Sequence, residues 1–214
     1  MMNINAKRLK TGTTTVGIVC KEGIVLAADK RVSAGYRISH KAFDKVHQIS
    51  DTIAVTTAGL VSDAQLITKL IKAELMLKKI RENREATVKE ASNLLANIVY
   101  GNIRRMSMVP GIVGFLLGGK DPEGYKLVEI GIDGSISYFD DYVSDGSGSD
   151  LALGVFEANY IKNASVEDGI KLALKAINAA MQRDMPTGNG IDVFTITDKG
   201  VKKVMTKTVE TRLL

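Results

Sequence analysis

The chain has 214 residues, 45% of them hydrophobic, and a formal net charge of +5 at pH 7. This length and apolar content suffice for a sizeable buried core, and we expect a single domain. No apolar run approaches the ~18 residues of a membrane span, and the first twelve residues lack a hydrophobic secretory segment. We therefore expect a cytoplasmic protein without membrane contact.

The positive charge does not by itself indicate a nucleic-acid partner. Most basic residues are mixed with acidic ones, as in segment 78–85, which is typical of a solvated helix end. Aromatic residues make up 5% of the chain and do not interleave with the basic residues, so no surface for stacking single-stranded bases is predicted.

The cysteine and histidine content also excludes several kinds of site. Cys20 is the only cysteine, so it cannot form an internal disulfide, and we interpret it as a small buried hydrophobe on a strand. The spacing of His40 and His47, the only histidines, matches no common metal site and argues against a histidine-based triad. We expect no metal and no cofactor.

The chain begins with predicted β structure. Apolar and alternating runs predict strands over 14–20 and 24–28, joined by a turn at 21–23, and a further strand over 52–57. This part of the molecule is expected to be rich in hairpins.

Two long amphipathic helices are predicted to follow. Ser62 with Gln65 has the pattern of a capping box before the first helix, and Thr87 with Glu90 has the same pattern before the second. The apolar residues that fall on one face are Ile67, Leu70, Ile71 and Leu75 in the first helix and Ala91, Leu94, Leu95 and Ile98 in the second.

The second half repeats this order of strands and helices. An α+β fold with helices packed outside the sheets is predicted, because strands and helices come in groups rather than in βαβ alternation. The predicted elements are strands over 112–117, 126–130 and 135–139, helices over 149–161 and from Ser165 onward, and strands over 191–196 and 201–205.

Two glycine-rich segments partly match nucleotide-binding motifs. Segment 114–121 resembles a phosphate-binding loop, but Asp121 replaces the metal-binding hydroxyl residue and Pro122 stands where a helix should start. Segment 146–149 lacks the third glycine of a dinucleotide fingerprint, since Leu151 occupies that place. A loop leading into a helix is the simpler interpretation of segment 146–149.

The segment around Thr13 carries the most informative chemistry. Cleavage between Gly12 and Thr13 would leave a threonine at a new amino terminus. Its own α-amine, with a reference pKa of about 7.7 to 8.0, could then accept the hydroxyl proton. Taken alone, the threonine run is more simply interpreted as the start of a strand, because threonine is a common strand former.

A nucleophile of this kind needs a fixed cation nearby, and that cation needs a carboxylate to orient it. Asp29 follows the second predicted strand, and Lys45 follows a polar connector. Both residue types suit these roles, although each alone is more often a surface charge and the spacing does not show that they meet.

Several short motifs occur in one order along the chain. They are Gly-Thr-Thr-Thr-Val-Gly at 12–17, Leu-Ala-Ala-Asp-Lys-Arg at 26–31, Lys45, Thr-Ala-Gly-Leu-Val-Ser-Asp-Ala at 57–64, Gly-Ser-Gly-Ser at 146–149, Gln-Arg-Asp at 182–184 and Gly-Ile-Asp-Val at 190–193. Together they resemble the catalytic β subunit of the 20S proteasome, most closely the archaeal type, over nearly the whole chain from Thr13 onward.

The resemblance implies the four-layer αββα sandwich of N-terminal nucleophile hydrolases. It implies that residues 1–12 are a propeptide removed by self-cleavage and that residues 13–214 form one peptidase domain. The implied activity is that of a threonine endopeptidase that hydrolyses unfolded proteins through an acyl-enzyme, with no cofactor.

The resemblance also assigns catalytic roles. Thr13 is the nucleophile, Lys45 lowers the pKa of its hydroxyl, Asp29 holds Lys45, and the Gly59 amide contributes the oxyanion hole. Three further residues are expected to hydrogen-bond around the Thr13 amine, namely Ser147, Asp184 and Thr187. Thr187 departs from the family pattern, where serine is common.

For substrate binding, the resemblance implies a pocket with Thr57 at its base. A small side chain with a hydroxyl at this position indicates a roomy, permissive pocket. The complete set of implied substrate-binding residues is Arg31, Val32, Ser33, Thr57 and Val61.

The implied partners are proteasome α subunits and other β subunits in stacked heptameric rings, together with a regulatory ATPase that unfolds substrates. A non-catalytic ring subunit that is never processed is the alternative, but such members commonly lose part of the set formed by Thr13, Asp29 and Lys45. A smaller two-ring bacterial relative shares the threonine chemistry and is generally shorter at its C-terminus.

Overall fold

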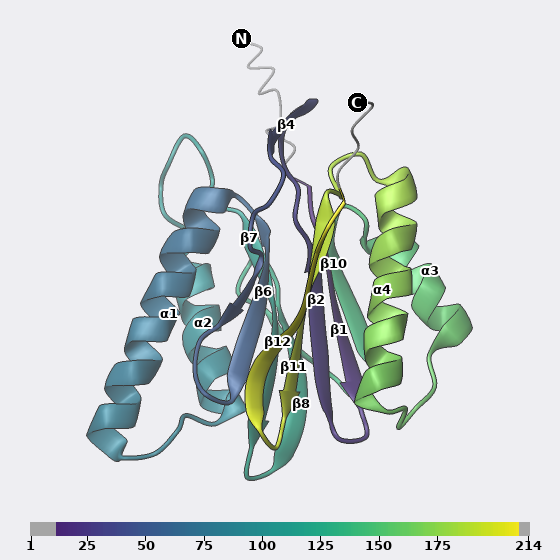
Figure 1. Ribbon diagram of the computed structural model, residues 1–214. Coiled ribbons are helices and arrows are strands. Elements are labelled where there is room, and N and C mark those ends of the chain that lie inside the picture. The colour runs from purple at the N-terminus through teal and green to yellow at the C-terminus, as the bar shows by residue number, and fades with distance from the viewer. Residues whose placement is uncertain (1–11, 210–214) are drawn as a thin grey trace.

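The computed structural model describes residues 12–209 (Figure 1). Of the expected propeptide, only Gly12 lies within this range; residues 1–11 lie outside the described residues. The α+β prediction is confirmed: two five-stranded sheets face each other, and two helices cover the outer face of each (Figure 1). This is the order of layers that the resemblance implied.

The first sheet contains the strand that follows Thr13. Its strand order is β10-β1-β2-β11-β12, with antiparallel neighbours throughout. The strands are β1 (Thr14–Cys20), β2 (Gly23–Asp29), β10 (Tyr142–Gly146), β11 (Gly190–Thr197) and β12 (Gly200–Thr208).

The second sheet has the order β5-β6-β7-β8-β9 and is also antiparallel. A separate short hairpin of β3 and β4 follows β2. The strands are β5 (Val46–Gln48), β6 (Ile53–Gly59), β7 (Val113–Asp121), β8 (Gly124–Ile130) and β9 (Ile136–Phe139), with β3 (Val32–Ala34) and β4 (Arg37–His40) in the hairpin.

Three apolar cores hold the four layers together. One lies between the second sheet and helices α1 (Val61–Glu82) and α2 (Val88–Ile103), and includes Phe115. Another lies between the first sheet and helices α3 (Ser149–Asn159) and α4 (Val166–Arg183), and includes Phe156. The third, which includes Leu26 and Leu116, fills the space between the sheets.

The predicted start of α1 is wrong. The helix begins at Val61 with Leu60 as its N-cap, and no side chain caps it, so Ser62 and Gln65 do not form a capping box. The Leu60 amide instead donates to the carbonyl of Ile112 at 2.9 Å, which fixes the chain beside β7 and starts the helix earlier. The capping box of Thr87 and Glu90 before α2 is confirmed.

One predicted core residue of α1 is also misplaced. Ile67, Ile71 and Leu75 are buried, as expected, but Leu70 is 44% exposed. Leu70 lies one residue before Ile71 and therefore points away from the narrow stripe that α2 and the second sheet cover.

Segment 114–121 is part of β7 and pairs with both β6 and β8, so it is not a phosphate-binding loop. Cys20 is buried, as predicted, and burial together with the nearby charge of Asp168 raises its pKa to about 11. Among residues 12–209, no helix has the length and apolar character to cross a bilayer.

The fold brings the start of β1 between two strand ends. Thr14 lies opposite Gly146 at the end of β10, and Thr15 lies opposite Ala28 near the end of β2. Strand β6 of the facing sheet ends at Gly59. Thr13 is therefore held where both sheets end, and side chains from several segments reach it.

Candidate active site

A small pocket surrounds Thr13. It is lined by residues that come from five separate segments of the chain, which the two facing sheets bring together. The lining residues are Gly12, Thr13, Arg31, Val32, Phe43, Lys45, Thr57, Gly59, Val61 and Ala64. Seven of the residues predicted from the sequence are among them: Thr13, Lys45, Gly59, Arg31, Val32, Thr57 and Val61.

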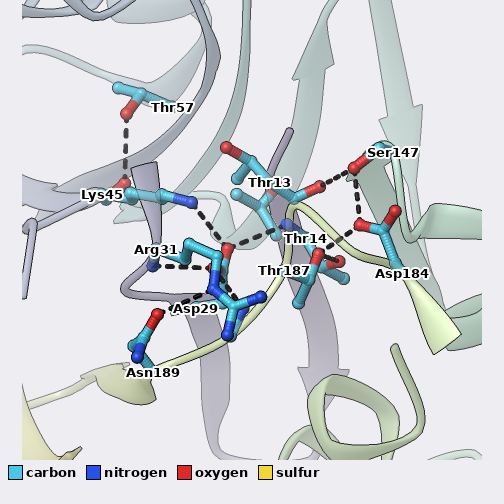
Figure 2. Close-up of polar contacts among 12 residues, drawn as sticks. Thr13, Thr14, Asp29, Arg31, Lys45, Thr57, Ser147, Asp184, Thr187 and Asn189 are labelled. Carbon is cyan, nitrogen blue, oxygen red and sulfur yellow. Dashed lines mark hydrogen bonds and ion pairs between the residues drawn. The ribbon is translucent and has the colours of Figure 1, made fainter. Parts of the chain in front are cut away.

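The Asp29 carboxylate is the hub on one side of Thr13 (Figure 2). Its Oδ1 accepts from Lys45 Nζ at 2.7 Å and from the amide of Thr14 at 3.0 Å. Its Oδ2 accepts from the amides of Arg31 and Gly188, each at 2.9 Å. A buried carboxylate with four donors is well compensated for the loss of water and has a fixed orientation.

Lys45 is buried together with its partner. Its side chain is 3% exposed, and that of Asp29 is fully buried. Burial lowers the pKa of Lys45, because an ammonium loses its hydration, while the charge and hydrogen bond of Asp29 act in the opposite direction. The pocket thus contains a lysine that deprotonates more easily than an exposed one and that one carboxylate holds in place.

On the opposite side of Thr13, two hydroxyl groups donate to the carboxylate of Asp184. Ser147 Oγ donates to Asp184 Oδ2 at 2.6 Å and lies 3.4 Å from the carbonyl oxygen of Thr13. The hydroxyl of Thr187 donates to the same oxygen of Asp184. All three predicted residues therefore lie together, and the hydroxyl of Thr187 contributes one of the two bonds to Asp184 (Figure 2).

Thr14 connects the two sides and was not predicted as a site residue. Its amide donates to Asp29, and its hydroxyl is 2.6 Å from the hydroxyl of Thr187. The side chain is fully buried. The sequence signal was only its position beside Thr13, since nothing local indicates a bond to a residue 173 positions away. Phe43, which lines the pocket, was not predicted either.

Gly59 sits in a backbone conformation that favours glycine, with φ of +139°. A Cβ built there would lie 2.3 Å from the carbonyl oxygen of Ile112 and 2.7 Å from Cα of Val113. The close approach of β6 and β7 therefore requires glycine at this wall of the pocket. Thr57, which also lines the pocket, donates its amide hydrogen to the Lys45 carbonyl at 2.9 Å.

Gly12 is equally confined. A Cβ built on it would lie 1.8 Å from Cβ of Pro186 and 2.8 Å from Ser147 Oγ. Only glycine therefore fits before Thr13 while the loop that contains Pro186 is in place. Before any cleavage, the nitrogen of Thr13 is the amide of its bond to Gly12.

The predicted substrate-binding residues differ in their surroundings. Arg31 lines the pocket, but its guanidinium donates to the carbonyl of Met185 and to Asn189 Oδ1, both at 2.7 Å. It thereby ties β2 to the loop of Pro186. Ser33 is not among the pocket-lining residues; its hydroxyl is buried without a hydrogen-bond partner in the described part of the chain. The substrate roles of these residues remain predictions.

Comparison with known proteins shows the family of the chain. A family model described as proteasome subunit matches residues 9–196. The chain belongs to the proteasome subunit family.

Its relatives include the proteasome subunit beta of Ferroglobus placidus, which is 43% identical over 200 residues, 93% of each chain. The proteasome subunit beta of Methanothermobacter thermautotrophicus is 40% identical over 211 residues, 98% of each chain. That of Archaeoglobus fulgidus is 40% identical over 197 residues, 92% of this chain and 91% of the relative. The resemblance to archaeal β subunits is confirmed.

Proposed function

We propose that this chain is a threonine endopeptidase subunit of a 20S proteasome core, activated by self-cleavage between Gly12 and Thr13. One observation carries the proposal: Thr13 lines the same small pocket as Lys45, and the Lys45 amine is bonded to the buried Asp29. The similarity to proteasome β subunits supports it over most of the chain.

Self-cleavage begins with attack of the Thr13 hydroxyl on the Gly12 carbonyl carbon. The peptide bond to the Thr13 nitrogen breaks, an ester forms on Oγ, and the nitrogen becomes a free amine. Water then hydrolyses the ester and releases residues 1–12 with a new carboxylate. Because the Thr13 nitrogen is still an amide at the start, another group must accept the hydroxyl proton. Burial lowers the pKa of Lys45, so the lysine can release its own proton and accept that of the hydroxyl in its neutral form, after which it is again the ammonium paired with Asp29.

Peptide hydrolysis uses the same nucleophile with its amine now free. The hydroxyl attacks the scissile carbonyl, the amine takes up the proton directly or through a water, and an acyl-enzyme ester forms before water resolves it. In this proposal the Gly59 amide stabilises the developing oxyanion. Ser147, Asp184 and Thr187 orient the new terminus through the hydrogen bonds described above.

Assembly with proteasome α subunits and other β subunits, in stacked heptameric rings in the cytoplasm, is part of this proposal. A regulatory ATPase would deliver unfolded proteins. Helix α1 supports the assembly, because a monomer rarely leaves so many apolar side chains of one helix exposed. Its exposed apolar residues are Leu66, Leu70, Met76, Leu77 and Ile80.

Intact-mass measurement tests the proposal. The chain is coexpressed with α subunits, and its mass is compared with that of the Thr13→Ala variant, with a fluorogenic peptide assay in parallel. We expect loss of residues 1–12 and peptidase activity in the wild type only. Retention of all 214 residues in the assembled, inactive wild type would favour the alternative, an unprocessed structural subunit.

A further inference from the structure

A second buried ion pair lies next to the pair of Asp29 and Lys45. Lys30 Nζ is 2.5 Å from Asp192 Oδ2 and 3.0 Å from Asp44 Oδ1. The side chains of Lys30 and Asp192 are 5% and 2% exposed, whereas that of Asp44 is 60% exposed. The proposed mechanism uses none of these residues.

Strand β12 completes this cluster from the other side of Asp192. Lys203 Nζ is 3.1 Å from Asp192 Oδ1 and 3.6 Å from Asp44 Oδ1, and the hydroxyl of Thr206 donates to Asp192 Oδ1 at 2.8 Å. Lys203 and Thr206 therefore still bind Oδ1 of Asp192 when the contact of Lys30 with Oδ2 is lost.

The position of Lys30 and Asp44 in the chain gives the contact between them a particular meaning. Lys30 directly follows Asp29, and Asp44 directly precedes Lys45. The main chain is tied at the same place, since the amide of Phe43 donates to the Lys30 carbonyl at 3.0 Å. Two adjacent bonds thus clamp segment 43–45, which belongs to no strand, onto the end of β2.

Lys45 depends on such a clamp. Its ammonium sits on a flexible four-carbon stem, and within the described residues its hydrogen bond goes to Asp29. Whether Nζ reaches both Asp29 and Thr13 is therefore set by where the main chain at residue 45 is held. Catalytic geometry is sensitive to displacements of about 1 Å, which can cost on the order of 10²-fold in rate.

We infer that Lys30 and Asp44 are positioning residues that set the separation between Asp29 and Lys45, an inference that rests on the proposed function of Thr13. Their charges fit the role. Burial alone lowers the pKa of Lys30, but its hydrogen bonds to Asp192 and Asp44 raise it, so the ammonium is retained. Burial raises the pKa of Asp44, but the hydrogen bonds with Lys30 and Asp192 and the charges of Lys30 and Lys203 together outweigh it and lower the pKa.

Three variants test the inference in the assembled, full-length protein. Asp44→Ala removes the clamp at an exposed position, so the fold survives. Asp44→Asn retains an oxygen that accepts from Lys30. Lys203→Met is the matched control, because it removes an ion pair with the same two carboxylates from β12 without touching the clamp. The readouts are kcat and KM for a fluorogenic peptide, the rate of loss of residues 1–12, and Tm.

For Asp44→Ala, we expect kcat and self-cleavage to fall about tenfold or more while KM changes by less than about twofold. Asp44→Asn should restore most of the rate. Lys203→Met should lower Tm and leave kcat within about twofold of the wild type. An unchanged kcat in Asp44→Ala, or an equal loss in Lys203→Met, would overturn the inference.

Crystal structures separate this inference from the proposed function. If the wild type shows neither processing nor hydrolysis, the proposed function fails. The positioning role of Lys30 and Asp44 is then tested by the distance from Lys45 Nζ to Asp29 Oδ1 alone. The clamp predicts that this distance, 2.7 Å in the wild type, lengthens in Asp44→Ala and not in Lys203→Met. An unchanged distance in Asp44→Ala refutes it.

Discussion

Asp29 and Asp145 are carboxylates on strands that flank β1, and their surroundings differ sharply. Asp29 ends β2 and accepts from Lys45 and three amides. Asp145, in β10, lies opposite Thr15 of β1. Within the described residues, its carboxylate accepts a single hydrogen bond, from the amide of the next residue, Gly146, at 2.6 Å.

The carboxylate of Asp145 points between the sheets. A Cβ built on Gly114 of β7 would lie 2.6 Å from its Oδ2, so the missing side chain of that glycine makes room for it. Burial raises the pKa of Asp145, and the amide of Gly146 offsets this in part. Burial also raises the pKa of Glu129 in β8, with the charge of Asp145 as the second cause.

The contrast shows what decides the state of a buried carboxylate in this fold. Burial alone raises the pKa of a carboxyl group. Several hydrogen-bond donors around the carboxylate stabilise its charged form and oppose this rise. The donors converge at Asp29, where the proposed chemistry needs a fixed cation. At Asp145 they do not, so the charge there should weaken the folded state at neutral pH.

Removing the charge of Asp29 should have the largest effect. Asp29→Asn leaves the buried Lys45 ammonium without its counter-ion, and breaking such a pair typically costs about 3–5 kcal/mol. We expect urea unfolding to show this decrease in stability. Intact mass should show that residues 1–12 remain attached. Asp198→Asn, at an exposed ion pair with Lys120, is the control and should leave the stability nearly unchanged. Equal stability of the Asp29 variant and the wild type would contradict the role assigned to this carboxylate.

Lys45→Arg should impair processing and peptidase activity on the order of 10²-fold, because a planar guanidinium cannot take the place of a compact ammonium beside Asp29. The charge is kept, so this variant separates geometry from charge. Single-turnover self-cleavage followed by mass spectrometry measures it, with the exposed Lys171→Arg as control. Near-normal turnover would remove Lys45 from the mechanism.

Asp145→Asn should stabilise the protein at pH 7 to 8, within the roughly 0.5–2 kcal/mol that favourable single substitutions reach. The pKa of Asp145 is higher in the folded state, so its contribution to stability is greatest below its unfolded pKa of about 3.9 and is lost as pH rises through the folded pKa. The advantage of the variant should thus shrink toward acid pH. Parallel stability-pH curves for the variant and the wild type would refute this.

Glu129→Gln should have the smallest effect, a gain below about 0.5 kcal/mol at pH 7. Part of the rise in the pKa of Glu129 comes from the charge of Asp145, so the two substitutions should not be additive. A double-mutant cycle by urea unfolding measures the coupling. Strict additivity would show that the two carboxylates do not interact.

The sequence predicted the elements whose signals are local. The strands at β1 and β2 and the capping box of α2 have period-two patterns or fixed offsets, and the structure has them at nearly the predicted bounds. Strand β10 was not predicted, because its partner β1 lies some 130 residues away and its last residues, Asp145 and Gly146, favour a turn.

The candidate site follows the same division. Thr13 could be singled out from local chemistry, and Asp29 and Lys45 from residue type, but their meeting depended on the resemblance. The roles of Thr14 and Lys30 could not be predicted, because their hydrogen bonds go to Thr187 and Asp192, which are 173 and 162 residues away in the chain. Hydroxyls and amines that act through such distant partners leave no spacing pattern in the chain.

The pairing of β1 has a consequence for the terminus that cleavage would create. Chain ends usually fray, since few contacts hold them. A cut before Thr13 leaves one residue outside a strand that is paired along both edges, to β2 and to β10. Fixing the backbone of one residue costs about 1–2 kcal/mol of conformational entropy. Here the backbone beside Thr13 is already fixed by folding, before any substrate binds. The new amino terminus would therefore begin one residue before a strand whose backbone is held on both edges.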